Sequence, residues 1–141
     1  MSFIIAFVLI ATAAIAQNAD AVVGFWHTKE GKAKVEIYKQ DNMYYGKIVW
    51  LKEPNENGKP KVDKENSDKN LRSKPLIGLL ILKNFVYDED NVWNDGEIYD
   101  PKNGKTYSCK MTLVSPNQLD IRGYIGISLF GRTETWTRTS Q

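Results

Sequence analysis

Polar and apolar side chains alternate along a series of short runs in this chain, and the clearest run spans residues 105–114. Tyr107, Cys109 and Met111 fall on one face of that run, with Ser, Lys and Thr between them. A repeat of two residues is typical of a β-strand with one buried and one exposed face. A helix would instead place every third or fourth residue on one face. The pattern therefore predicts an all-β fold.

Similar runs recur between short segments rich in Gly, Pro, Asn and Asp, and most connections have the length of a hairpin loop. Successive antiparallel strands lose their free edges when they close into a barrel or stack as two sheets. We expect a small antiparallel β-barrel of about eight strands, whose interior holds side chains or one small ligand. A two-sheet β-sandwich is the alternative. The predicted strands are residues 24–28, 32–39, 43–51, 79–87, 92–99, 105–114, 119–124 and 132–139.

Two connections stand out in the sequence. Residues 100–104 form the clearest hairpin turn, because Pro101 restricts φ and Asn103-Gly104 tolerates positive φ. The connection 52–77 is long and is expected to be irregular, with Ser67-Asp68 capping a single helical turn at residues 69–72. The side-chain oxygens of Asp63, Asn66 and Asp68 suit calcium but do not have the spacing of a calcium loop, so we interpret these residues as turn-forming and loop-capping groups.

The first sixteen residues contain no charged side chain and end in Ala14-Ile15-Ala16, a small-x-small pattern. The apolar run is shorter than the roughly 20 residues that span a bilayer. We predict a signal peptide at residues 1–16, cleaved before Gln17, and a single β-barrel domain at residues 17–141. No Lys or Arg precedes the apolar run, so either the amino terminus supplies the charge or the start has lost residues. The expected location is periplasmic or secreted, with no membrane span after cleavage.

The charge pattern argues against a nucleic-acid partner. The chain has 19 basic and 17 acidic residues, a formal net charge of +2, and the two signs are interspersed. The lysine-rich stretch 52–74 carries nearly as many carboxylates as cations, whereas a nucleic-acid surface would be one-sided.

The residue types that usually carry catalysis or bind metals are scarce. Cys109 is the one cysteine and falls on an apolar strand face, so it is predicted to be an inert core thiol without a disulfide. His27 is the one histidine. A single His and a single Cys supply neither a nucleophile–base pair nor a transition-metal site. The sequence favours a protein that is not an enzyme and has no cofactor, metal or catalytic residues.

Aromatic and arginine side chains on the predicted strands suggest a binding cavity. Arg122 and Tyr124 share one face of their strand, and Trp136 shares a face with Arg132 and Arg138. Such a face, turned inward, would form a cavity with a few convergent polar groups. The alternative is that these side chains occupy ordinary core and surface positions. The predicted ligand-binding residues are Trp50, Trp93, Tyr99, Arg122, Tyr124 and Trp136.

Several longer motifs resemble a known family. They are Gly46-Lys47-Ile48-Val49-Trp50-Leu51, Asp63-x-x-Asn66, Leu71-Arg72-x-x-Pro75-Leu76-x-Gly78, Trp93-x-x-Gly96-x-Ile98-Tyr99-Asp100-Pro101-x-x-Gly104-x-x-Tyr107, Arg122-Gly123-Tyr124-x-Gly126 and Gly131-Arg132 to Trp136. Together they resemble the bacterial domain of unknown function family 2147, which consists of small exported proteins. The resemblance implies a lipocalin-like barrel in the bacterial envelope and brings no reaction or catalytic residues.

The start of the mature chain is also similar to that of lipocalin-like barrels. Gly24-Phe25-Trp26 resembles their Gly-x-Trp opening. In those barrels a late arginine covers the tryptophan, which here would be Arg138 or Arg132 through a cation–π contact.

Our leading functional hypothesis is an exported barrel that binds a small, partly apolar or amphipathic ligand in the bacterial envelope. One alternative is a protein-interaction or inhibitor module that contacts an envelope partner through loops such as 127–130. A second alternative is an envelope hydrolase that uses the carboxylates Glu97 and Asp100. Residues three apart on a strand face opposite sides, which disfavours this pairing.

Overall fold

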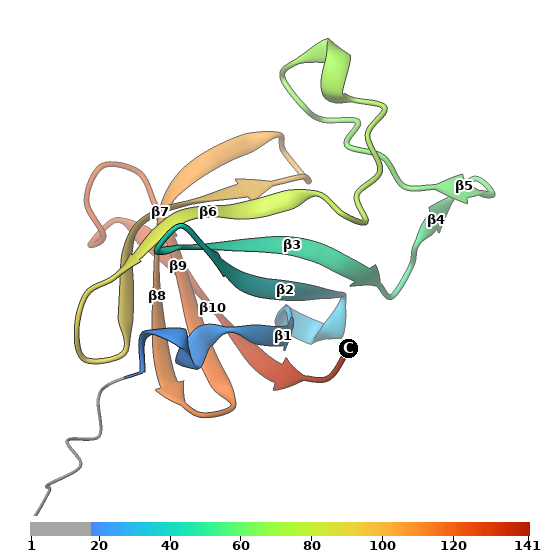
Figure 1. The fold of residues 1–141 in the computed structure, drawn as a ribbon. Coiled ribbons are helices and arrows are strands. Elements are labelled where there is room, and N and C mark those ends of the chain that lie inside the picture. Colours follow the sequence, from blue (N-terminus) through green and yellow to red (C-terminus); the bar gives the residue numbers. More distant parts are fainter. Residues whose placement is uncertain (1–17) are drawn as a thin grey trace, which may run out of the picture.

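The computed structural model describes residues 18–141, and eight of its strands form a closed antiparallel barrel (Figure 1). Each of these strands pairs with the next one along the chain, and the last pairs with the first. The strands are β1 (Gly24–His27), β2 (Ala33–Gln40), β3 (Met43–Leu51), β6 (Leu80–Tyr87), β7 (Val92–Asp100), β8 (Lys105–Ser115), β9 (Gln118–Tyr124) and β10 (Gly131–Thr139). The predicted barrel is confirmed, and the sandwich alternative is excluded. The predicted signal peptide lies outside the described residues.

The hairpin turns form where the sequence predicted them. Between β2 and β3, Asp41 and Asn42 have φ of 50° and 64°, a twist that suits the flanking strands. Between β7 and β8, the Asp100 carboxylate accepts a hydrogen bond from the Lys102 N–H at 2.9 Å. Gly104 then has φ 71°, and its N–H donates to the Asp100 carbonyl at 2.8 Å.

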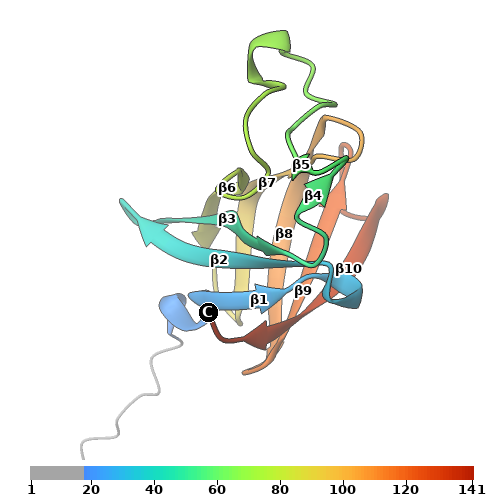
Figure 2. The same cartoon turned by 90° about the vertical axis from the view of Figure 1, so that its right-hand side faces the viewer.

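The segment between β3 and β6 is more ordered than expected. It contains a short hairpin of β4 (Asn55–Glu56) and β5 (Lys59–Pro60), turned by positive φ at Asn57 and Gly58. The expectation of an irregular segment was therefore wrong for these residues. The predicted helical turn is present as the 3-10 helix η3 (Lys69–Leu71), and the Asp68 carboxylate accepts from the Asn70 N–H. Figure 2 shows this segment standing out from one end of the barrel, away from the 3-10 helix η1 (Ala19–Val22).

Helix η1 covers the opposite end of the barrel, which we call the closed end. Trp26 is buried there, and its indole Nε1 donates to the Val22 carbonyl at 2.9 Å. The Arg138 guanidinium lies 4.3 Å from the Trp26 ring centroid, so Arg138 is the arginine of the predicted cation–π contact. Arg138 also donates to three carbonyl oxygens, those of Ala21, Val23 and Pro116. One side chain thus joins η1, the start of β1 and the β8–β9 turn.

Large side chains fill the barrel near the closed end. Tyr44, Phe85, Trp93 and Met111 are all buried in one apolar cluster. Cys109 belongs to the same cluster, and burial raises the pKa of its thiol to about 12. The thiol therefore stays protonated and inaccessible, as predicted for an inert core cysteine.

We expect Arg138→Ala to lower the free energy of unfolding by about 3 kcal/mol, because three charge-assisted hydrogen bonds and a cation–π contact are lost. Arg138→Lys should recover only part of this, since an ammonium group cannot reproduce the planar fork of donors. Urea unfolding measures both values. Arg132→Ala is the control, because this exposed arginine makes no ion pair with another described residue, and its effect should stay within about 0.5 kcal/mol. Equal effects of the two alanine variants would contradict this role of Arg138.

Candidate functional site: a cavity at the open end of the barrel

An inner cavity of about 1280 Å³ opens at the barrel end opposite η1. Its floor consists of buried apolar side chains from five strands, namely Val35, Ile48, Ile81, Ile121 and Trp136. These side chains do not fill the barrel cross-section here, whereas the larger rings at the closed end do. The result is a concave, mostly apolar chamber of the kind that holds small molecules.

Charged side chains surround the mouth of this cavity. They come from the β1–β2 connection, the 52–65 segment, the β7–β8 turn and the start of β10. Lys32 donates to Glu30 and holds the pKa of that carboxyl below its usual range, and the nearby Lys29 and Lys102 add to the effect. Arg132 also lines the cavity. Lysines therefore surround Glu30, while the lining of the whole cavity has seven basic and six acidic side chains, so its mouth is charged but nearly balanced.

Strand β10 places a polar and aromatic face inward. Arg132, Glu134 and Trp136 all line the cavity, as one of the two predicted faces. The Trp136 indole Nε1 donates to Glu134 Oε1 at 3.0 Å, and the Lys29 N–H donates to the same oxygen at 3.2 Å. Glu134 thus orients the indole and ties the β1–β2 connection, including the 3-10 helix η2 (Lys29–Gly31), to the cavity wall.

The equivalent polar face of β9 points outward. Leu119 and Ile121 are buried inside, and Ile121 and Gly123 line the cavity. Since side chains alternate along a strand, Arg122 and Tyr124 lie on the outer surface. The alternation was predicted correctly, but which face points inward could not be inferred for each strand.

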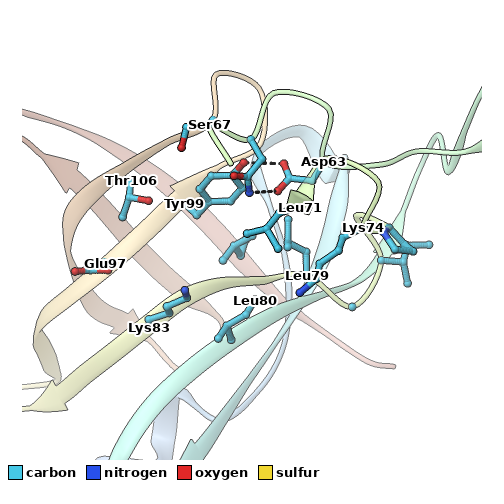
Figure 3. Close-up of a pocket in the computed structure, with 16 residues that line it drawn as sticks. Asp63, Ser67, Leu71, Lys74, Leu79, Leu80, Lys83, Glu97, Tyr99 and Thr106 are labelled. Carbon is cyan, nitrogen blue, oxygen red and sulfur yellow. Dashed lines mark hydrogen bonds between the residues drawn. The ribbon is translucent and has the colours of Figure 1, made fainter. Parts of the chain in front are cut away.

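A second, outer cavity of about 740 Å³ lies between the 63–78 segment and the barrel wall (Figure 3). The buried Asp63 carboxylate faces it and accepts hydrogen bonds from the Tyr99 hydroxyl at 2.7 Å and the Asn66 side-chain amide at 2.8 Å. Burial, followed by the Asp63 bond, raises the pKa of Tyr99 to about 12. Tyr99 and Ile81 line both cavities, so these two residues lie between them.

Asp63 is a site residue whose main partner was missed from the sequence. From the sequence, Asp63 and Asn66 were interpreted only as turn-forming groups. The contact with Tyr99 spans 36 residues, and no local pattern indicates it. Gly104 supports the same arrangement, because its lack of a side chain lets the β7–β8 turn approach the Glu65 backbone closely.

Two of the six predicted ligand-binding residues, Trp136 and Tyr99, line the inner cavity. Trp93 is buried near the closed end, where its indole Nε1 donates to the Ala19 carbonyl at 3.0 Å. Trp50 is exposed, with the Lys34 ammonium 5.5 Å from its ring centroid. Arg122 and Tyr124 lie on the outer face of β9. The structure thus brings two of the six together, and a ligand-binding role for any of them remains a prediction.

The carboxylates considered for hydrolysis do not converge. Glu97 lines the outer cavity, whereas Asp100 lines the mouth of the inner one. Within residues 18–141, no three His, Cys, Asp or Glu side chains form a group suited to hold a metal ion. No helix in this range is long and apolar enough to span a membrane.

Comparison with known proteins places the chain in a family. The family model described as "Uncharacterized protein conserved in bacteria (DUF2147)" matches residues 24–138. The chain belongs to this family. The fold is also similar to a solved structure of protein HP1028 from the human pathogen Helicobacter pylori, which is described as belonging to the lipocalin family. That match has a TM-score of 0.75 and 23% identity, and covers 84% of this chain and 83% of the other. No curated protein matches the chain.

The Asp63–Tyr99 contact of this DUF2147 barrel is expected to hold the 61–76 segment over the barrel wall. Asp63→Ala would leave the Tyr99 hydroxyl and the Asn66 amide without their partner, a cost of about 1–3 kcal/mol. Hydrogen exchange should then accelerate by about tenfold or more in residues 61–76 and stay unchanged in β8–β10. Asp68→Ala is the matched control, because it removes only the cap of η3. Equal exchange in both variants would show that Asp63 does not anchor the segment.

Proposed function

We propose that this chain binds a small, partly apolar ligand in the inner cavity. The observation that carries the proposal is the combination of a buried apolar floor with a charged mouth in one cavity of about 1280 Å³. Apolar burial supplies affinity for the body of the ligand, and the few polar groups at the mouth orient it. Trp136 would contact the apolar part, and Tyr99 would lie near the mouth.

The fold comparison supports this proposal at the level of architecture. A closed eight-stranded barrel is just large enough to hold one small ligand when bulky side chains do not fill it. The similarity to HP1028, at 23% identity, supports the fold alone. The kind of ligand is therefore inferred from the residues that line the cavity.

The binding experiment uses the cavity tryptophan as a reporter. Straight-chain fatty acids of increasing length are titrated into the protein, with tryptophan fluorescence and native mass spectrometry as readouts. A bound ligand should change the emission in the wild type and in Trp50→Phe, since Trp50 lies outside the cavity. Trp136→Phe should lose most of the change while native mass spectrometry still detects the complex.

A cavity-filling variant tests where the ligand binds. A Cβ atom at position 123 would lie at ordinary contact distances of 3.4 and 3.8 Å from Ile98 and Tyr107, and Gly123 lines the cavity, so we expect Gly123→Leu to fold and to occupy cavity space. We expect it to weaken fatty-acid binding by at least about tenfold, which corresponds to about 1.4 kcal/mol. Tyr124→Leu changes the outer face of the same strand and should bind normally. Undiminished binding by Gly123→Leu would sink the proposed site.

We also propose that the protein acts outside the bacterial cytoplasm. The support is the uncharged apolar segment 1–16, which ends in a small-x-small pattern. Expression of the full chain in a bacterium, followed by periplasmic extraction and intact mass measurement, should yield a protein that begins at Gln17. Ala14→Asp together with Ala16→Asp should block this processing. An uncut protein confined to the cytoplasm would contradict export.

A further inference from the structure

The β9–β10 loop exposes a cluster of large apolar side chains. Ile125, Ile127, Leu129 and Phe130 are 74%, 58%, 75% and 71% exposed. We refer to residues 125–130 as the apolar tip. Single exposed apolar residues are common on protein surfaces, but four within six consecutive positions form a patch that usually marks an interaction site.

The backbone of the apolar tip is held in place by Arg122. The guanidinium of Arg122 donates to the Ser128 carbonyl at 2.6 Å, to the Leu129 carbonyl at 3.3 Å and to the Thr133 hydroxyl at 2.8 Å. The Phe130 N–H closes a turn onto the Ile127 carbonyl at 3.1 Å. These hydrogen bonds hold the loop backbone against the outer face of β9. The apolar side chains of the loop are left exposed to solvent.

Two arginines flank the tip. Arg122 and Arg132 are the charged residues nearest to it in the sequence, and the nearest carboxylates, Asp120 and Glu134, each lie two residues further away along their strands. Lys105 begins β8, which pairs with β9, at the same end of the barrel as the tip. Arg132 follows the tip after Gly131 and also lines the mouth of the inner cavity.

We propose that the apolar tip docks onto an anionic lipid bilayer. Shallow insertion of a few apolar side chains, together with basic residues beside them, is enough for reversible attachment to such a surface. A stable protein–protein interface instead requires about 20–30 residues on each side, far more than this tip offers. Because the tip and the cavity mouth lie at the same barrel end, docking would bring the mouth close to the lipid. The attachment itself does not depend on what the cavity binds.

Co-sedimentation with lipid vesicles tests the attachment. We expect the mature protein to bind vesicles that contain phosphatidylglycerol and to bind phosphatidylcholine vesicles much more weakly. Leu129→Ser with Phe130→Ser should lower the bound fraction at limiting lipid by at least about tenfold, since two apolar side chains no longer leave water. Val114→Ser is the matched control, because Val114 is 54% exposed at the β8–β9 turn and should change nothing.

The charge contribution is measured with the same vesicles. Lys105→Gln with Arg132→Gln should weaken binding to phosphatidylglycerol vesicles and reduce its salt dependence, whereas Lys69→Gln in η3 should not. Binding that is indifferent to lipid charge and to both tip substitutions would overturn the proposal. So would a protein that stays off all vesicles, or one whose tip instead drives dimerisation in sedimentation velocity.

A site-specific label tests which part of the protein enters the bilayer. Cys109 is buried with a raised thiol pKa, so a new surface cysteine can be labelled alone in the folded protein. An environment-sensitive fluorophore on Ile127→Cys should shift to the blue on addition of phosphatidylglycerol vesicles, and the same label on Val114→Cys should not. A shift at both positions would show attachment without the proposed orientation and would contradict it. Fatty-acid binding by the Leu129→Ser, Phe130→Ser variant should be unchanged, which separates this proposal from the cavity.

Discussion

The pairing of β1 with β10 is the contact on which the rest of this structure depends. It joins strands from opposite ends of the chain and leaves no free edge in the eight-stranded sheet. Arg138 reinforces the closure. Its guanidinium covers the Trp26 ring and donates hydrogen bonds to the carbonyls of Ala21 and Val23, just before β1. Once the sheet is closed, each strand has an inside and an outside. The distinction between core, cavity and surface follows from that.

The two ends of the barrel differ because the inward side chains differ in size. Near η1, the rings of Trp26, Tyr44, Phe85 and Trp93 are buried together in one apolar cluster. Toward the other end many inward positions carry smaller residues such as Val35, Ile48 and Gly123, beside the polar and aromatic face of β10. Tight packing and open space are therefore separated along the barrel axis: the large rings pack together at the closed end, and the inner cavity lies at the open end.

Three of the four connections at the open end are longer than any turn at the closed end, and the two longest each have their own means of support. The 52–78 segment is anchored by the buried Asp63–Tyr99 contact, which divides an outer cavity from the inner one. The β9–β10 loop is held by Arg122, whose role is to position backbone rather than to contact the inner cavity. Arg122 was predicted to be a ligand-binding residue, and in the structure it positions a loop beside the cavity.

The sequence alone determined the eight barrel strands and the hairpin turns between them, because a two-residue repeat and the positive φ tolerated by Asn, Asp and Gly are local properties. It also determined that Arg132, Glu134 and Trp136 share a face. Only the tertiary structure decided that this face points inward while that of Arg122 and Tyr124 points outward. Alternation creates two faces on each strand, but closure of the sheet selects which one is buried. The Asp63–Tyr99 contact and the place of Trp93 at the closed end depend on long-range register, which no local pattern records.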